Sequence, residues 1–229
     1  MVTIVAHRGA SKRAHENTLE AFMQAASLGA DMIELDVRKT ADGILVVFHD
    51  PGFDGSSTAG MLAGMTFAKA RQHAAKKKFT LATVDEVFSA LAGKVQFDIE
   101  LKEPGYAGEV VALARKRLDI AACVFTSFDP RIIAAVKAED PHLVTGLILA
   151  NTDAFRWCSG TGAEVFAPEK KLFSLKREFF EDAHRQGRHI AVWTVDSRPL
   201  LARLLADPIV SAIITNYPDR ALALRNQLS

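Results

Sequence analysis

The sequence is poor in several features that define large classes of protein. It has only 2 cysteines among its 229 residues, Cys123 and Cys158, too few for a disulfide framework and not in a metal-binding spacing. No apolar run reaches the ~18 residues of a membrane-spanning helix, and no basic stretch followed by a long apolar one marks a signal peptide. We therefore expect a cytoplasmic protein without a membrane span.

Neither sign of charge dominates. Lys and Arg total 28 against 27 Asp and Glu, which argues against a nucleic-acid partner and against a polybasic membrane anchor. The first apolar segment is followed by Gly9-Ala10-Ser11, which is not the G-x-G-x-x-G loop of a dinucleotide-binding fold. Hydrophobic residues make up 49% of the chain, enough at this length for one large core.

Short apolar segments with strand character alternate with helical patterns along the whole chain. They are residues 3–7, 31–39, 44–49, 95–101, 123–127, 144–149, 163–167, 189–195 and 211–215. This alternation predicts a parallel sheet covered by helices, and the length suits a closed TIM-type (β/α)8 barrel. We find no linker, so residues 1–229 should form a single domain.

One connection is too short for a parallel crossover, which needs about a dozen residues. The strand segments on either side of residues 40–43 are separated by these residues alone, and Asp42-Gly43 is typical of a two-residue hairpin turn. We therefore expect an antiparallel β-hairpin over residues 31–49, with Asp36 opposite His49. The hairpin also explains why the chain has one strand segment more than the barrel requires.

Residues 50–82 follow the hairpin and are too long for a plain barrel loop. They are rich in Gly, Ser, Thr and Ala, most densely at residues 54–60. We expect a short insertion over the rim that has few apolar anchors of its own and forms a low, open cap.

Charged side chains lie within otherwise apolar strands. Glu34 and Asp36 are one pleat apart on the same strand face, and Asp98 and Glu100 repeat this pattern in a later strand. Buried charges are costly, so several together indicate a site, although ion pairs on a barrel rim would give each residue a purely structural role. In a βα barrel such groups gather at the carboxyl ends of the strands.

The groups expected to meet there have complementary chemistry. They are three carboxylates, two histidines and two cations: Glu34, Asp36, Glu100, His7, His49, Arg8 and Lys102. Oxygen ligands favour Mg²⁺ or Ca²⁺ over zinc, and the cations suit an anionic substrate. Two histidines can supply a proton acceptor and a proton donor near neutral pH. Together these groups suit metal-assisted cleavage of a phosphoester.

Ordered motifs over nearly the whole chain resemble those of the glycerophosphodiester phosphodiesterases. The motifs are His7-Arg8-Gly9, His15-Glu16-Asn17-Thr18, Glu34-Leu35-Asp36-Val37, Asp42-Gly43, His49-Asp50, Ile99-Glu100-Leu101-Lys102, Ser127-Phe128, Trp193-Thr194-Val195 and Thr215-Asn216-Tyr217-Pro218. The resemblance implies a phospholipase-C-like TIM barrel that hydrolyses small-molecule glycerophosphodiesters to sn-glycerol 3-phosphate and an alcohol. It also implies one divalent cation, Mg²⁺ or Ca²⁺, as cofactor.

The resemblance also implies a role for each matching residue. These roles are metal ligands (Glu34, Asp36, Glu100), acid/base pair (His7, His49), phosphate contacts (Arg8, Lys102), lining of the glycerol side (Trp193) and support of the site (Glu16, Asp50, Asn216). The chain departs from the usual motifs around the rim. His15 replaces a proline, Asp196 stands where Asn is usual, Asn216 stands where Asp is usual, and residues 54–58 replace a basic-Thr-Thr segment.

Two alternatives stay open at the level of sequence. A lysophospholipase D-type lipid phosphodiesterase would use the same chemistry, and exposure of Phe155, Trp157 and Phe173 at the rim would favour it. A non-catalytic barrel that binds a phosphate ligand would keep the fold without needing an acid/base couple. The sequence indicates no oligomeric state.

Overall fold

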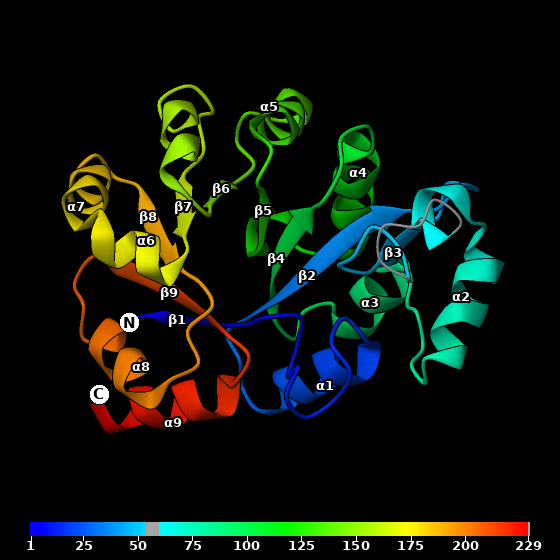
Figure 1. Cartoon of the computed structure of the whole chain (residues 1–229), viewed down its shortest axis with the longest axis horizontal. Coiled ribbons are helices and arrows are strands. Elements are labelled where there is room, and N and C mark those ends of the chain that lie inside the picture. The colour runs from blue at the N-terminus through cyan, green and yellow to red at the C-terminus, as the bar shows by residue number, and fades with distance from the viewer. Residues whose placement is uncertain (54–59, 229) are drawn as a thin grey trace.

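The computed structural model describes residues 1–53 and 60–228. Within these ranges nine strands form one sheet, and the pairing of β1 with β2 closes its eight parallel strands into a barrel (Figure 1). The strands are β1 (Thr3–Ala6), β2 (Met32–Lys39), β3 (Leu45–Val47), β4 (Gln96–Leu101), β5 (Cys123–Ser127), β6 (Thr145–Leu149), β7 (Val165–Pro168), β8 (His189–Val192) and β9 (Val210–Thr215). The predicted TIM-type (β/α)8 barrel is confirmed, and every expected strand segment overlaps an observed strand.

Helices surround the barrel on its outer side (Figure 1). They are α1 (Leu19–Ser27), α2 (Phe67–Lys76), α3 (Val84–Leu91), α4 (Ala107–Arg117), α5 (Pro130–Glu139), α6 (Lys170–Leu175), α7 (Arg177–Arg185), α8 (Arg198–Leu205) and α9 (Pro218–Leu228), with 3-10 turns η2 (Leu62–Gly64), η3 (Ile120–Ala122) and η4 (Thr152–Trp157). Local sequence sets several starts: Thr83 and Glu86 form a capping box on α3, and Asp129 caps α5 ahead of Pro130. In the described part of the chain, no helix combines the length and apolarity needed to cross a bilayer.

The predicted hairpin is present, and β3 pairs with the part of β2 that extends beyond its neighbour β1. β2 has 8 residues and β1 has 4, so β1 pairs only with Met32 and Ile33 at the start of β2. The second half of this edge would be left unpaired, and β3 covers it in antiparallel orientation.

The register of the hairpin differs by one residue from the prediction. Asp36 lies opposite Phe48, whose backbone N–H donates to the Asp36 carbonyl at 2.9 Å, and not opposite His49. The loop has three residues, 41–43, because Ala41 joins the expected Asp42-Gly43 turn, in which Gly43 adopts φ +84°. One additional loop residue shifts the pairing by one position, as a period-two structure requires.

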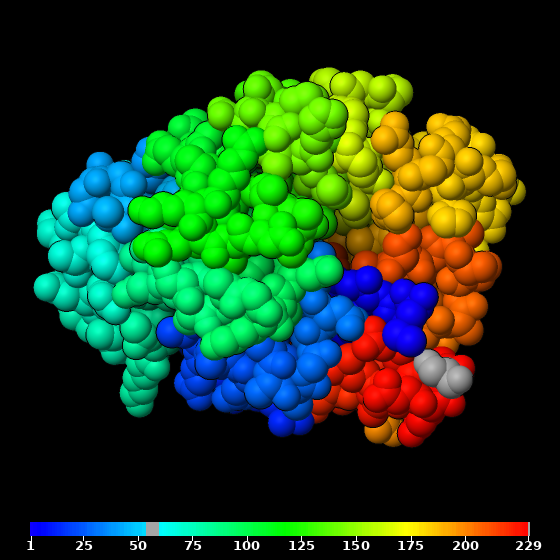
Figure 2. Space-filling view, turned by 180° about the vertical axis from the view of Figure 1, so that it is seen from behind, coloured from blue at the N-terminus to red at the C-terminus, as the bar shows by residue number. Residues whose placement is uncertain are grey.

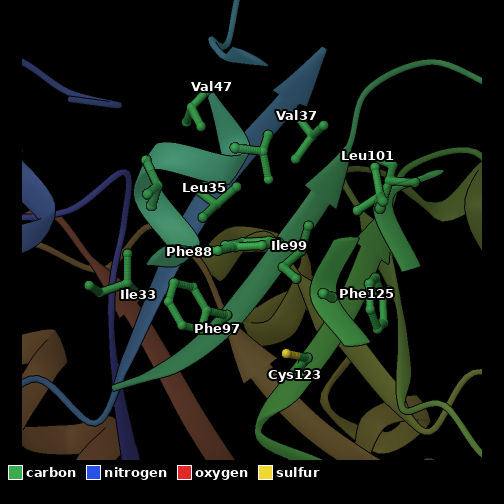
Figure 3. Close-up of a cluster of buried hydrophobic side chains, with 14 of the residues drawn as sticks. Ile33, Leu35, Val37, Val47, Phe88, Phe97, Ile99, Leu101, Cys123 and Phe125 are labelled. Carbon is green, nitrogen blue, oxygen red and sulfur yellow. The ribbon is translucent and has the colours of Figure 1, made fainter. Parts of the chain in front are cut away.

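The outward faces of the strands form the main hydrophobic core with the helices. On β2 and β4 this face consists of Ile33, Leu35, Val37, Phe97, Ile99 and Leu101, each at most 1% exposed (Figure 3). Phe88 of α3 packs onto them and meets Phe97 edge to face at 5.3 Å between ring centroids. Since side chains alternate along a strand, the residues between these apolar positions point into the barrel.

The insertion differs from the expected low cap. α2 stands outside the ring of helices beside β3 (Figure 1). This part of the molecule has a small core of its own, formed by Val46, Phe53, Leu62, Met65, Ala70, Ala74 and Leu81. The expectation of few apolar anchors was wrong because the Gly- and Ser-rich composition is densest at residues 54–60, and the apolar positions lie on both sides of this stretch. Within this stretch, residues 54–59, including the 54–58 replacement, lie outside the described residues.

The last helix packs against the first strand at the amino ends of the barrel strands. Figure 2 shows the N-terminal segment in blue beside the C-terminal one in red. Arg225 of α9 donates to the Val2 carbonyl at 3.0 Å and pairs with Asp31, which in turn accepts the backbone N–H of Ile4 at 2.7 Å. These contacts attach the last helix to the first strand.

We expect Phe88→Ala to lower the free energy of unfolding by about 3–5 kcal/mol, because it removes a fully buried ring that contacts β2 and β4. Urea denaturation followed by circular dichroism measures this change. Met23→Ala is the control, since Met23 is 42% exposed and its loss should change stability by no more than about 0.5 kcal/mol. Equal effects of the two substitutions would contradict this description of the core.

Candidate active site

A pocket lies at the carboxyl ends of the strands. It is lined by His7, Arg8, Glu34, His49, Asp98, Glu100, Lys102, Thr126, Phe128, Ile148, Ala167, Trp193 and Ile214. Apart from Arg8 and His49, these residues share the inward phase of the strands or of their direct continuations. Period-two alternation therefore explains most of the site, as the sequence predicted.

The interior of the barrel has two chemically different sides. One side carries carboxylates of β2 and β4, where Glu34 pairs in register with Asp98 and Asp36 with Glu100. The opposite side is apolar and consists of Ile148, Ala167 and Ile214, with Val5 and Ala191 below them.

Three of the carboxylates converge. Glu34, Asp36 and Glu100 each offer one oxygen, and these oxygens lie within 4.8 Å of one another. All three side chains are buried, and Asp36 is 0% exposed. Burial brings these groups into one low-dielectric volume, where their charges interact strongly.

The pKa values of the three carboxylates are shifted in different directions. Burial, together with Asp36 and Glu100, raises the pKa of Glu34 well above its usual value. Burial and Asp36 raise the pKa of Glu100 to about 7. Burial would also raise the pKa of Asp36, but Lys102 and Arg8 outweigh it and lower this pKa to about 2. Of the three, Asp36 is thus the member that stays ionised well below neutral pH.

Two cations neutralise Asp36. Lys102 Nζ lies 2.9 Å from Asp36 Oδ1 and also contacts Glu100, while Arg8 Nε lies 3.2 Å from Asp36 Oδ2. Only one carboxylate oxygen of Glu34 has a hydrogen-bond partner among the described residues: Oε2 accepts the Arg8 backbone N–H at 2.7 Å. Its buried Oε1 finds no hydrogen-bond partner among the described residues. An orphaned carboxylate oxygen beside two other carboxylates fits a divalent cation with oxygen ligands.

The loop after β1 is bent to reach this cluster. Arg8 and Asn17 both adopt φ +56°, in the left-handed region that non-glycine residues seldom occupy. Asn17 Nδ2 donates to Asp36 Oδ2 at 2.7 Å, and the Asn17 backbone N–H donates to the Arg8 carbonyl at 3.1 Å. Gly9, at φ +82°, lies against the Ala21 backbone, where a Cβ would come within 2.7 Å of it. The strain is therefore located where the loop contacts Asp36.

The two histidines are held through Nδ1 by different partners. His7 Nδ1 lies 2.8 Å from Asn216 Oδ1, and His49 Nδ1 lies 2.7 Å from Asp50 Oδ1. Burial and Arg8 lower the pKa of His7, and burial and Lys102 lower the pKa of His49. Both pKa values thus lie below the usual value of an imidazole.

An aromatic wall closes one side of the pocket. Trp193 Nε1 donates to the Ala167 carbonyl at 2.7 Å, and its ring meets Phe128 edge to face at 5.7 Å. Lys102 Nζ lies 5.9 Å from the centroid of Phe128, within the range of a cation–π contact. Trp193 thus reaches the pocket as expected.

Glu16 has a less direct place. It is exposed and is not among the residues lining the pocket, and it reaches the site by accepting from Arg8 Nη1 at 2.8 Å. Asp50 is also exposed and contacts the pocket through His49.

Sequence reasoning assigned no role to four residues that the structure brings into or behind the site. They are Asn17, Arg38, Asp98 and Asp196. Asp98 had a usable signal, since it follows the same inward phase as Glu100; burial raises its pKa to about 7. Arg38 had none, because its contact, a hydrogen bond from Nε to the His49 carbonyl at 2.8 Å, depends on the path of the chain after β3.

Comparison with known proteins agrees with the resemblance in the motifs. Residues 7–220 match the model of the Glycerophosphoryl diester phosphodiesterase family. Because this match spans nearly the whole chain, the chain belongs to that family and is a hydrolase of phosphoric diesters.

Individual relatives cover the same length. The glycerophosphodiester phosphodiesterase of Caldanaerobacter subterraneus subsp. tengcongensis is 30% identical over 235 residues, which cover 96% of each chain. The crystal structure of glycerophosphodiester phosphodiesterase from Agrobacterium tumefaciens is 26% identical, with a TM-score of 0.82 and coverage of 99% of this chain and 100% of that one. An Oleispira antarctica phosphodiesterase in complex with the product sn-glycerol-3-phosphate shares the fold at 21% identity, with a TM-score of 0.84 and coverage of 98% and 96%.

We expect the affinity for Mg²⁺ to rise as pH increases from 6 to 8. Glu100 has a pKa of about 7 and the pKa of Glu34 is raised well above its usual value, so a cation must displace protons from them. Each displaced proton should give roughly a tenfold gain in affinity per pH unit. Titration calorimetry in two buffers of different ionisation enthalpy measures both the affinity and the number of protons released. Glu100→Gln should flatten the slope, and an affinity independent of pH would contradict the displacement of protons from Glu34 and Glu100.

Proposed function

We propose that the protein hydrolyses glycerophosphodiesters to sn-glycerol 3-phosphate and an alcohol, with one divalent cation, Mg²⁺ or Ca²⁺, as cofactor. The observation that carries the proposal is the convergence of three buried carboxylates within 4.8 Å in a pocket that also contains two histidines and two cations. Membership of the Glycerophosphoryl diester phosphodiesterase family supports the substrate class.

Glu34, Asp36 and Glu100 would hold the cation. Bound there, it would polarise a phosphoryl oxygen and stabilise the negative charge that develops on the phosphate. Arg8 and Lys102, which flank Asp36 and line the pocket, provide the remaining positive charge for the phosphate.

His7 is suited to accept the proton of the attacking hydroxyl, which belongs to water or to the glycerol 2-position. The Asn216 amide oxygen accepts from Nδ1 of His7, so Nε2 is left as the basic nitrogen. A neutral amide gives little stabilisation to an imidazolium, and Arg8 further disfavours it.

His49 is suited to protonate the leaving oxygen. Its Nδ1 contacts the carboxylate of Asp50, which favours the protonated imidazolium and so opposes the lowering of the His49 pKa by burial and Lys102. The Arg38 guanidinium holds the backbone carbonyl of His49 and keeps this residue at the pocket although it lies beyond the end of β3. Different environments for two titratable groups are the usual basis for dividing acid and base roles.

The apolar half of the pocket suits the glycerol unit. Trp193 would lie along its C–H groups together with Ile148, Ala167 and Ile214, opposite the charged half that takes the phosphate. The pocket thus matches a small ligand that is anionic at one end and weakly apolar at the other.

The rim offers little for the lipid alternative. Of the three aromatic residues considered for an acyl site, Phe173 is 2% exposed and Phe155 stacks on Phe179 at 4.1 Å. Trp157 is 44% exposed, with the Arg156 guanidinium 5.3 Å from its ring centroid. A barrel that only binds a phosphate ligand would not need two histidines whose Nδ1 atoms are both held by hydrogen bonds.

We expect release of glycerol 3-phosphate from glycerophosphocholine, glycerophosphoethanolamine and glycerophosphoglycerol at similar kcat/KM. EDTA should abolish it, and Mg²⁺ or Ca²⁺ should restore it. The monoacyl counterpart of glycerophosphocholine, assayed below its micelle concentration, should be preferred by less than about tenfold, because few CH₂ groups can be buried at about 0.8 kcal/mol each. Undiminished activity after exhaustive chelation, or a larger acyl preference, would overturn the corresponding part of the proposal.

We expect His7→Ala and His49→Ala each to lower kcat by ~10²–10⁴-fold on an alkyl diester, with the fold retained. An aryl leaving group needs little protonation, so it should partly rescue His49→Ala and not His7→Ala. His142→Ala is the matched control, because His142 is exposed and outside the pocket. Near-normal kcat in either active-site variant, or rescue of His7→Ala instead, would contradict the assigned roles.

A further inference from the structure

We propose that Asp196 is a positioning residue that sets the tautomer of His7 through the side-chain amide of Asn216. The inference rests on the base role proposed above for His7. Asp196 follows β8 and does not line the pocket, so it acts on the site only through its neighbour.

The carboxylate of Asp196 fixes the orientation of the amide. Its Oδ2 accepts Nδ2 of Asn216 at 2.7 Å, and its Oδ1 accepts the Asn216 backbone N–H at 2.9 Å. A carboxylate only accepts hydrogen bonds, so the amide must turn its NH₂ group toward Asp196 and its oxygen away.

The amide oxygen in turn fixes the proton on the imidazole. Asn216 Oδ1 accepts from Ser11 Oγ at 3.0 Å and lies 2.8 Å from His7 Nδ1. Since this oxygen can only accept, a neutral His7 carries its proton on Nδ1 and keeps Nε2 basic. Asp196 therefore fixes the orientation of the Asn216 amide, and this amide fixes the tautomer of the His7 ring.

Asp196 is itself well held. Thr215 Oγ1, a fully buried side chain, donates to its Oδ1 at 3.1 Å, and Arg220 Nη1 donates to its backbone carbonyl at 2.6 Å. The preceding residue, Val195, donates its backbone N–H to the Ile214 carbonyl at 2.9 Å. A carboxylate fixed on both its side chain and its backbone can orient a partner without moving.

Two of the departures noted in the sequence are in contact in the structure. Asp196 and Asn216 exchange the amide and the carboxylate relative to the usual motifs, and they are hydrogen-bonded to each other. Either order of the pair gives both a complementary amide–carboxylate contact and an acceptor on His7 Nδ1, whereas two amides or two carboxylates do not give both. This property allows the proposal to be tested by exchange.

The test compares Asp196→Asn, Asn216→Asp and the double exchange D196N/N216D in the full chain. In D196N the new NH₂ group faces that of Asn216, so the Asn216 amide turns over and directs NH₂ at His7, which moves the ring proton to Nε2. In N216D two carboxylates meet at the 2.7 Å contact and repel. The double exchange restores a complementary pair. Asp219→Asn is the control, an acid-to-amide change at an exposed ion pair with Arg13.

Two readouts decide the proposal. Long-range ¹⁵N spectra of the His7 ring should show the Nδ1–H tautomer in the parent protein, the control and the double exchange, and Nε2–H in D196N. On glycerophosphocholine, kcat of D196N should fall by ~10²–10⁴-fold with KM changed by less than about threefold, and the double exchange should recover at least about tenfold of that loss.

Unchanged ring spectra in D196N, or a double exchange no more active than D196N, would overturn the proposal. If D196N does not fold, the double exchange alone decides, because an Nε2–H tautomer there contradicts the mechanism and Nδ1–H supports it. The spectra need no turnover, so they distinguish failure of this inference from failure of the proposed function.

Discussion

The burial of Asp36 is the constraint on which the site depends. Its carboxylate is 0% exposed in the middle of a cluster of acids, a placement that is tolerable only if nearby groups compensate the charge. Lys102 and Arg8 supply the charge, and Asn17 supplies a hydrogen bond. The left-handed conformations of Arg8 and Asn17 follow from this requirement, since they bring both side chains back from the loop after β1.

How far the site could be predicted depends on which interactions are local. The inward set on each strand follows from alternation, so the sequence is sufficient to assign Glu34, Glu100 and Lys102 to the site. The partner of His49 across the hairpin could not be assigned in this way, because one additional loop residue, Ala41, shifts the pairing by one position. Asp196 shows a further limit: a contact with Asn216 across two strands leaves no periodic signal in the sequence.

The division of the barrel interior into a charged and an apolar half separates two physical tasks. The charged half must keep its groups ionised or ready to ionise in a medium that disfavours charge, which requires the close pairing seen around Asp36. The apolar half, formed from β6, β7 and β9, requires only packing and has small or aliphatic side chains. This contrast orients a ligand that spans both halves, because exchanging its ends would lose binding free energy on both sides.

The two histidines show how charge is distributed around such a crowded site. His49 lies near the rim, and its carboxylate partner Asp50 is exposed, so the negative charge of this pair is screened by solvent. His7 shares the pocket with Glu34 and Glu100 and feels the charge of Asp36, so a further carboxylate in direct contact would add to a cluster whose pKa values are already raised at Glu34 and Glu100. Asn216 gives the ring its acceptor without that charge, and Asp196 carries the charge one residue farther out, where it is partly exposed and held by three donors. The neutral partner of the buried histidine and the charged partner of the exposed one thus follow from the same electrostatic limit.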